Sequence, residues 1–287
     1  MKITKAIIPV AGYGTRFLPA TKVQPKEMMP IVDTPIIEFL VHEAIQSGIT
    51  DILFVVHPTR SNVDKHFAQH KELEEFLSER GKQDVIDKLE YLHKQANFSY
   101  VAQEKPAGNG DAIMKGQSFI GEEPFAAFYA DDVVVSKDTP ALKQLIDVYD
   151  RYKNSVMGLV EVPTQDVVNY GIAKGDEVED GVIKINSVVE KPAVDEAPSN
   201  LASIGRFVLT PDVFEYIQKQ PAKNGETYLS EALGELAKEG KVYGKKIDGT
   251  WHDCGSKFGL WKANLEMGLE HPEIKSLAQE HIRKMNK

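Results

Sequence analysis

Short apolar runs alternate with amphipathic segments along the first half of the chain, and this alternation restricts the fold more than any other feature of the sequence. Four runs have the length of buried strands: Lys5–Val10, Asp51–Val56, Phe98–Gln103 and Phe125–Tyr129. The segments between and after them predict helices: Pro35–Ser47, Ser61–Lys94 with a break at Gly81, Gly110 to about Gln117, and Thr139–Tyr152. Because parallel strands need long crossover connections, the sequence predicts a largely parallel sheet with helices on both faces.

The second half of the chain has a different pattern. Strand-like runs separated by short turns occupy Val156–Val162, Ile172–Lys174, Val182–Glu190 and Ile204–Leu209. Helical patterns follow at Pro211–Lys219, Tyr228–Glu239, Ser256–His271 and Glu273–Lys284. We therefore expect one α/β domain over residues 1–287, with a Rossmann-like, mixed, mostly parallel sheet flanked by helices, a small added β lobe and a helical C-terminal tail.

Composition limits the partners and the compartment. The 287-residue chain is 42% hydrophobic, which is enough for a large core. It has 34 lysines and arginines against 43 aspartates and glutamates, and this net charge of −9 argues against nucleic-acid or anionic-membrane partners. A single cysteine, Cys254, excludes an intrachain disulfide and favours a cytoplasmic location. Pro9 and Gly12 break the first apolar run, so we expect no signal peptide, and no run approaches the roughly 18 apolar residues of a membrane span.

A glycine-rich, basic loop follows the first predicted strand. Its sequence, GYGTRFLPATKVQPKEMMP, runs from Gly12 to Pro30. Glycine loops between a strand and a helix expose backbone N–H groups that suit phosphate oxygens. Phe17 stands where the dinucleotide fingerprint has its third glycine, and no P-loop motif occurs. Arg16, Lys22 and Lys26 favour a polyphosphate ligand over the alternative of a solvated basic loop.

Carboxylates from two distant segments suggest a metal site. Asp131 and Asp132 follow the predicted strand Phe125–Tyr129, near the edge where open α/β sheets bind ligands. Asp253 lies much later, in the sequence WHDCG. Two such carboxylates together with a polyphosphate are a usual arrangement for Mg²⁺. The alternative for the adjacent pair is a simple turn at the end of the strand.

Several of these motifs together resemble one family. Gly12-x-Gly14-Thr15-Arg16 followed by Pro25-Lys26 resembles the signature of the sugar-phosphate nucleotidyltransferases. The longer FLPATK…PKEM…P run is similar to that of the bacterial UTP–glucose-1-phosphate uridylyltransferases (UDP-glucose pyrophosphorylases). Further similar stretches, in the family's order, are QEKPAGNGDAI, NYGI, VVEKP, ASIGRFVL and WHDCGSKFGLWKAN. The resemblance covers nearly the whole chain.

This resemblance implies a fold, a reaction and an assembly. The fold is of the nucleotidyltransferase type, with a nucleotide-binding half at about 1–155, a sugar-phosphate-binding half at 156–250, and a metal-ligand segment with a helical tail at 251–287. The reaction converts UTP and α-D-glucose 1-phosphate into UDP-glucose and pyrophosphate, with Mg²⁺ as cofactor. The family forms homodimers and homotetramers. A sugar 1-phosphate, with a second pKa of about 6, is mostly a dianion and can attack the α-phosphorus without a protein nucleophile.

The resemblance also implies roles for individual residues. The catalytic cations are Arg16 and Lys26. The nucleotide ligands are Ala11, Gly12, Gly14, Thr15, Glu27, Gln103 and Gly108. Among these, Gln103 and Gly108 contact the uracil base, and Glu27 and the Ala11-Gly12 backbone close its other side. The sugar-phosphate ligands are Gly171, Glu190 and Lys191, and the metal ligands are Asp131 and Asp253, with Asp132 left to a turn or a supporting role. The family's LTDA motif stands here as Leu229-Ser230-Glu231-Ala232.

Other conspicuous residues have simpler interpretations. His66 and His70, four apart on a predicted helix, favour a solvated face over a metal clamp. Cys254 is expected to pack, and the aromatic cluster around Trp251, Phe258 and Trp261 is expected to pack or to contact another subunit. Two alternative functions stay open. One is the same reaction with dTTP or another hexose 1-phosphate, and the other is a non-catalytic, nucleotide-sugar-binding regulatory protein.

Overall fold

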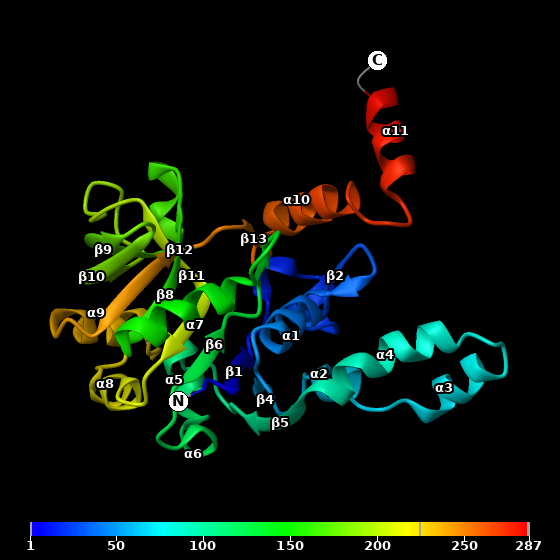
Figure 1. Cartoon of the computed structure of the whole chain (residues 1–287), viewed down its shortest axis with the longest axis horizontal. Helices are drawn as coiled ribbons and strands as arrows, with labels where there is room; N and C mark the ends of the chain where they lie inside the picture. Colours follow the sequence, from blue (N-terminus) through cyan, green and yellow to red (C-terminus); the bar gives the residue numbers. More distant parts are fainter. Residues whose placement is uncertain (1, 224, 286–287) are drawn as a thin grey trace.

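A nine-stranded mixed sheet forms the centre of the part of the chain that the computed structural model describes, residues 2–223 and 225–285 (Figure 1). The strand order is β5-β4-β1-β6-β11-β8-β12-β10-β9. The strands are β1 (Lys5–Val10), β4 (Asp51–Val56), β5 (Asn97–Ala102), β6 (Phe125–Phe128), β8 (Ser155–Glu161), β9 (Gly171–Glu179), β10 (Val182–Glu190), β11 (Leu201–Leu209) and β12 (Val242–Lys246).

The sheet has a parallel half and an added, mostly antiparallel lobe. Strands β5, β4, β1 and β6 are parallel to one another. Strand β11 runs against β6, β8 and β9, and β10 runs against β12 and β9, while β8 and β12 are parallel. This arrangement confirms the predicted α/β fold with a mixed sheet, whereas the expectation of a mostly parallel sheet holds only for the half formed by β5, β4, β1 and β6.

Helices cover both faces of the sheet, as the alternation in the sequence predicts. On one face lie α1 (Ile36–Gln46) and α7 (Ala141–Tyr152), and on the other lie α5 (Gly108–Met114), α8 (Val213–Lys219) and α9 (Leu229–Lys238). Successive residues of β1 alternate between the two cores: Ile8 belongs to the first and Ile7 to the second. The site therefore rests on a sheet that is fixed from both sides.

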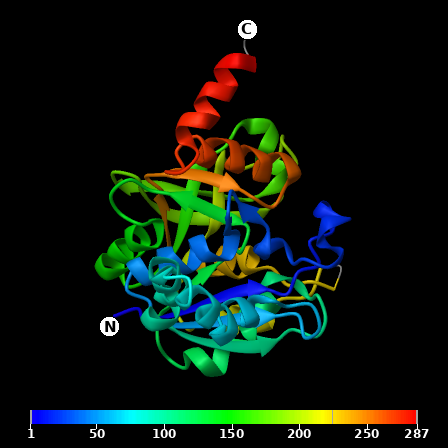
Figure 2. The same ribbon diagram turned by 90° about the vertical axis from the view of Figure 1, so that its right-hand side faces the viewer.

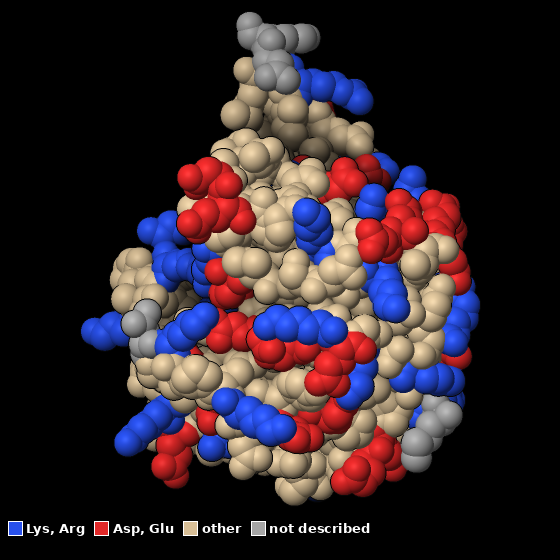
Figure 3. All heavy atoms as spheres, turned by 90° about the vertical axis from the view of Figure 1, so that its left-hand side faces the viewer, with Lys and Arg blue, Asp and Glu red and all other residues tan. Residues whose placement is uncertain are grey.

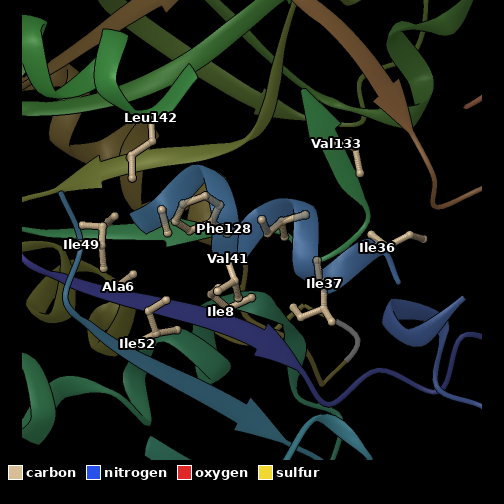
Figure 4. Packing of buried hydrophobic residues seen from close by; sticks show 14 of the residues in the cluster. Ala6, Ile8, Ile36, Ile37, Val41, Ile49, Ile52, Phe128, Val133 and Leu142 are labelled. Carbon is tan, nitrogen blue, oxygen red and sulfur yellow. The ribbon is translucent and has the colours of Figure 1, made fainter. Parts of the chain in front are cut away.

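Figure 4 shows the first of these cores, in which α1 lies on β1 and β4. The apolar residues of α1 recur at helical spacing, and Ile37 and Val41 are fully buried beside Ile8 and Ile52. Gly48, with φ of +95°, follows the helix end in a conformation that glycine adopts without strain. The predicted helix Pro35–Ser47 is thus one residue longer at each end than the observed α1.

Two helical segments project from the sheet in Figures 1 and 2. The first is formed by α2 (Val63–His66), α3 (Lys71–Ser78) and α4 (Gln83–Gln95), with the predicted break at Gly81. The second is the helical tail, α10 (Lys257–Gly268) and α11 (Lys275–Met285), and α11 has no buried residue. Phe258 and Trp261 stack on each other but are 70% and 57% exposed, so they do not pack into the core.

Several short elements were missed or misplaced by the sequence analysis. The additional strands are β2 (Pro30–Ile31), β3 (Thr34–Pro35), β7 (Asp132–Val135), β12 and β13 (Thr250–Asp253), and the additional helix is α6 (Gln117–Ile120). Strands β12 and β13 carry polar and charged residues, so pairing with β8 and β7, not an apolar run, defines them. Helix α5 begins at Gly108, two residues before its predicted start at Gly110, and β9 extends well beyond the predicted strand Ile172–Lys174.

Charged side chains of both signs are mixed on the surface around the added lobe (Figure 3), and no helix among the described residues is suited to span a membrane. Figure 3 shows the face around the added lobe, where Lys and Arg side chains are interspersed with Asp and Glu side chains. Among residues 2–223 and 225–285, no helix combines the length and the apolar composition needed to cross a bilayer.

Candidate functional site

Most of the predicted site residues line a single cavity of about 840 Å³. The cavity lies where β1, β5 and β6 end and where the added lobe faces them. The predicted residues in its lining are Ala11, Gly12, Arg16, Lys26, Gln103, Gly108, Asp131, Gly171, Glu190, Lys191 and Asp253. Three predicted residues, Gly14, Thr15 and Glu27, are not part of this lining. The fold thus brings segments from the whole length of the chain to one place.

The basic loop after β1 folds as three short 3-10 turns, η1 (Thr15–Phe17), η2 (Ala20–Lys22) and η3 (Lys26–Met28). Gly14 precedes η1 with φ of +60°, and a Cβ there would lie 3.1 Å from side-chain atoms of Lys26 and Thr21. The Thr21 hydroxyl donates to the Gly14 carbonyl at 2.7 Å. Gly14 therefore serves the turn itself, and its predicted contact with the nucleotide stays a prediction.

Two of the three loop cations point into the cavity. Lys26 Nζ donates to Asp131 Oδ2 at 2.7 Å, and Arg16 Nη1 donates to the Gly255 carbonyl at 3.0 Å. Burial acts to lower the pKa of Lys26, but the Asp131 carboxylate outweighs it, so the pKa of Lys26 is raised. Burial acts to raise the pKa of Asp131, and Lys26 outweighs it in the same way, so that this pKa is lowered. Lys22 is exposed and is absent from the lining.

Asp131 and Asp253 meet at Gly255, a residue that the sequence analysis did not single out. A Cβ on Gly255 would lie 2.7 Å from Asp131 Oδ2, 3.0 Å from Asp253 Oδ1 and 3.3 Å from Arg16 Nη1. A side chain at this position would fill the space between the two carboxylates, which explains the glycine after Asp253-Cys254. The main chain of the two segments is also joined, because Cys254 N donates to the Asp131 carbonyl at 2.8 Å. These two carboxylates are the groups that could hold a metal ion.

Asp132 also lines the cavity but is buried, and both of its carboxylate oxygens have partners on other strands. Its Oδ1 accepts from Trp251 Nε1 at 2.6 Å, and its Oδ2 accepts from the Gly205 N–H at 2.8 Å. Burial, with the negative charges of Asp131 and Asp253 added, raises the pKa of Asp132 to about 7. Asp132 thus ties β7 to β11 and β13, and the two adjacent aspartates have separate tasks.

A buried ion pair beneath the cavity was missed by the sequence analysis. Arg206, which is fully buried, donates to both oxygens of Glu43, at 2.9 and 3.0 Å. It also donates to the Asp132 carbonyl at 2.8 Å. The sequence did contain a sign of this ion pair, because an arginine within the apolar stretch ASIGRFVL would be buried and a buried charge needs a partner.

The predicted base-binding residues lie at the end of β5 and at the start of α5. Gln103 is buried, and its Nε2 donates to Asp111 Oδ2 at 2.7 Å. Gly108 has φ of +90°, and a Cβ there would come within 2.2 Å of the Thr227 carbonyl. Thr227 N donates to the Ala107 carbonyl and Gly110 N donates to the Thr227 carbonyl, both at 2.9 Å. The chain's own backbone therefore requires glycine at position 108.

The predicted sugar-phosphate residues lie in the antiparallel pair β9–β10. Gly171 and Glu190 are direct partners in the register, and a Cβ on Gly171 would lie 3.2 Å from Glu190 Oε2. Ser230, at the start of α9, donates to Glu190 Oε2 at 2.7 Å and also lines the cavity. Lys191 Nζ lies 3.5 Å from Glu190 Oε1. Glu231 stands where the family's LTDA motif has an aspartate. Its side chain pairs with Lys223 and is not part of the lining, so this replacement does not alter the cavity wall.

The remaining conspicuous side chains have structural partners. Cys254 is buried as expected, and burial raises the pKa of its thiol to about 12. His66 contacts Glu38 at 2.7 Å, whereas His70 Nδ1 accepts from Leu73 N at the start of α3. The two histidines do not share a helix, because α2 ends at His66. The prediction of a common helix was therefore wrong.

Comparison with known proteins gives the chain a family. The nucleotidyl transferase family matches residues 5–269. The chain is 42% identical to UTP–glucose-1-phosphate uridylyltransferase 1 of Staphylococcus saprophyticus over the full length of both proteins. It is 43% identical to the uridylyltransferase YngB of Bacillus subtilis, covering 96% of this chain and 93% of the relative.

Solved structures agree with these relatives. A UDP-glucose pyrophosphorylase complexed with UDP-glucose has a TM-score of 0.85 at 38% identity and covers 92% of this chain and 98% of its own. A UTP-bound UGPase from Acinetobacter baumannii has a TM-score of 0.90 at 34% identity and covers 98% of both chains. The fold, the order of the motifs and the relatives agree, and the chain therefore belongs to the nucleotidyl transferase family.

Proposed function

We propose that the chain is a UTP–glucose-1-phosphate uridylyltransferase, which converts UTP and α-D-glucose 1-phosphate into UDP-glucose and pyrophosphate. One observation carries this proposal: four of the residues predicted for the nucleotide and all three predicted for the sugar phosphate line one cavity, together with Arg16 and Lys26. The full-length relatives bear the name of this activity, and two similar structures were solved with UDP-glucose and with UTP.

In the proposed reaction, a phosphate oxygen of the sugar phosphate attacks the α-phosphorus of UTP, and pyrophosphate leaves. The reaction brings two polyanions together, so its main demand is neutralisation and alignment of charge. Arg16 and Lys26 supply fixed positive charge at the cavity wall, and the contact with Asp131 keeps Lys26 protonated. No protein nucleophile is needed in this scheme, which agrees with the packed, non-reactive Cys254.

The proposed cofactor is Mg²⁺. Among residues 2–223 and 225–285, no group of three or more His, Cys, Asp or Glu side chains forms a ready-made metal site. Asp131 and Asp253 nevertheless direct hard oxygen atoms to one point, and this donor set fits an ion that takes few protein ligands and completes its shell with water and phosphate. When bound there, Mg²⁺ would neutralise phosphate charge between the two substrates.

The two substrates would use opposite sides of the cavity. On the nucleotide side, Gln103 and the backbone at Gly108, Ala11 and Gly12 would contact the uracil. On the sugar side, Glu190 would accept from sugar hydroxyls and Lys191 would bind the phosphate. We further propose a cytoplasmic homodimer or homotetramer built from single-domain subunits, a state that light scattering on a sizing column would measure.

A substrate matrix tests the proposed function. Pyrophosphate release would be measured for UTP, dTTP, CTP and ATP, each with glucose 1-phosphate and with galactose 1-phosphate, in the presence of Mg²⁺. We expect the highest kcat/KM for UTP with glucose 1-phosphate. A higher kcat/KM with dTTP would mean that the chain catalyses the same reaction with dTTP as its nucleotide substrate. Tight nucleotide-sugar binding without pyrophosphate release from any pair would overturn the enzymatic proposal in favour of a regulatory protein.

A further inference from the structure

Tyr170 contacts two parts of the cavity that lie far apart in the sequence. It stands between η4 (Thr164–Asn169) and β9, in the cavity wall formed by the added lobe. Its hydroxyl donates to Asp253 Oδ2 at 2.9 Å. Its ring packs edge-on against Trp251, with ring centroids 5.2 Å apart at an interplanar angle of 70°. A residue of the sugar-phosphate side thus contacts a candidate metal ligand directly.

The carboxylate of Asp253 is held at both oxygens. While Oδ2 accepts from Tyr170, Oδ1 accepts from the Gly255 N–H at 2.9 Å. The same Oδ1 lies beside the point that Asp131 Oδ2 approaches. With one donor on each oxygen the carboxylate plane cannot rotate freely, so the unused lone pairs of Asp253 stay directed at the point shared with Asp131.

The main chain of Tyr170 acts on the sugar-phosphate side. Its carbonyl accepts from Lys191 N at 3.0 Å. Lys191 has φ of +45°, a left-handed conformation that costs a non-glycine residue free energy and persists only where neighbouring contacts maintain it. The hydrogen bond to Tyr170 is such a contact. One residue therefore fixes Asp253 through its side chain and Lys191 through its backbone.

We propose that Tyr170 is a positioning residue that orients Asp253 for metal binding and couples the metal-binding segment to the sugar-phosphate-binding lobe. This proposal rests on the proposed function of the site. It assigns to the tyrosine of the NYGI stretch a task that the sequence analysis did not consider. Removal of the hydroxyl frees one oxygen of Asp253, lets the carboxylate rotate away from the shared point, and so weakens the binding of a divalent ion.

Tyr170→Phe tests the proposal because it deletes one oxygen atom and keeps the ring, its packing on Trp251 and the backbone bond to Lys191. We expect the Kd for Mn²⁺, measured by electron paramagnetic resonance in the presence of UTP, to rise about tenfold to a hundredfold. The metal concentration for half-maximal activity should rise with it, while UTP binding without metal should be unchanged. A wild-type Kd for Mn²⁺ in the folded variant would overturn the proposal.

Tyr152→Phe is the matched control. Its hydroxyl also donates to a carboxylate, Glu179 Oε1, at 2.5 Å, but neither residue lines the cavity. This variant should bind Mn²⁺ and turn over as the wild type does. Thermal melting of both variants separates a loss of fold from a loss of metal binding, since the expected defect of Tyr170→Phe is in metal affinity at an unchanged Tm.

A double-mutant cycle shows whether Tyr170 acts through Asp253. In the Asp253→Ala background, adding Tyr170→Phe should change the residual Mn²⁺ affinity by less than about twofold, because the partner of the hydroxyl is already gone. An additive loss would mean that Tyr170 acts by another route and would overturn the proposal. The binding assay also separates the two proposals: a wild type that binds Mn²⁺ but releases no pyrophosphate would overturn the uridylyltransferase function and leave the role of Tyr170 intact.

Discussion

The parallel half and the added lobe hold their site residues in different ways. In the parallel half, Gly12, Gln103 and Asp131 follow the ends of β1, β5 and β6, on loops that the strands leave at one edge of the sheet. In the added lobe, Gly171 is the first residue of β9 and Glu190 is the last residue of β10, and the two are direct partners in the ladder. Loop geometry places the first set, and strand register places the second.

Because the two regions hold their site residues differently, we expect them to respond differently to amino-acid substitutions. Loop residues of the parallel half depend on local contacts, such as those of Gly14 with Thr21 and of Gly108 with Thr227. A residue within an antiparallel pair depends on the whole register, because a slip of one position turns its side chain to the other face of the sheet. The antiparallel pair β9–β10 already contains register shifts between Val182 and Ile183 and between Ile185 and Ser187. We therefore expect a substitution in one of the loops to remove a single contact and to have a large effect on the neighbouring site residues.

The largest effect is expected in the parallel half, at the contact between Lys26 and Asp131. Lys26→Ala should reduce kcat about a hundredfold or more, to the point of abolishing measurable turnover, because it removes a positive charge at the cavity wall. Asp131→Asn should have an effect of the same size, because it removes the carboxylate that pairs with Lys26 and that is a candidate ligand of the metal ion. Pyrophosphate release with saturating Mg²⁺ measures the loss. Lys22→Ala, on the same loop but exposed, is the control and should keep the wild-type rate. Wild-type rates in either cavity variant would contradict the assigned roles.

Much of the parallel half could be predicted from the sequence, whereas less of the added lobe could. Strands β1 and β4 were predicted residue for residue, because apolar runs bounded by turns define them. Strand β12 of the added lobe was missed because it takes its definition from pairing with β8 and β10, not from its own composition. The same holds for the site: Asp131 and Asp253 were predicted, but the contacts of Tyr170, Ser230 and Gly255 with site residues depend on long-range packing that no local pattern encodes.

Two glycines with positive φ values give a sharper test of whether single close contacts fix the loops of the parallel half. Gly108→Ala should destabilise the fold by more than about 3 kcal/mol, because the added Cβ meets the Thr227 carbonyl, and it should raise the KM for UTP. Gly81→Ala is the control, since Gly81 also has a positive φ, of +67°, in the turn that ends α3, but nothing lies within 4 Å of the added Cβ. It should cost only about 1 to 2 kcal/mol, with an unchanged KM. Urea unfolding measures both, and equal losses would contradict the close contact at Thr227.

The buried carboxylate of Glu27 makes the stability of the parallel half depend on pH. Glu27 is 1% exposed, neither of its carboxylate oxygens has a hydrogen-bond partner among the described residues, and burial raises its pKa from 4.5 to about 7. Between these values the folded chain keeps the proton and the unfolded chain releases it, so the free energy of unfolding falls as the pH rises and levels off above about 7.

Glu27→Gln removes this dependence, because glutamine does not titrate. We expect the fall in the free energy of unfolding between pH 4.5 and pH 8 to be smaller in the variant by about 3 kcal/mol. Urea unfolding at a series of pH values measures it, with the exposed Glu104→Gln as control. Identical pH profiles for Glu27→Gln and the wild type would show that Glu27 is not buried as a neutral acid. The predicted contact of Glu27 with the base stays a prediction that the KM of the same variant for UTP would test.

The smallest effect is expected in the added lobe, where Ser230 orients Glu190 without being part of the β9–β10 register. Ser230→Ala removes the donor to Glu190 Oε2, so this carboxylate loses a contact that fixes it in the cavity wall. The KM for glucose 1-phosphate should rise about tenfold, as for a lost hydrogen bond to a charged group, with the KM for UTP unchanged. Glu231→Gln, the next residue of α9, is the control, since its side chain pairs with Lys223 and is not part of the cavity wall. An equal rise in both KM values would mean that Ser230 supports the cavity as a whole. The difference between the loops of the parallel half and the strands of the added lobe would then not extend to the binding of the two substrates.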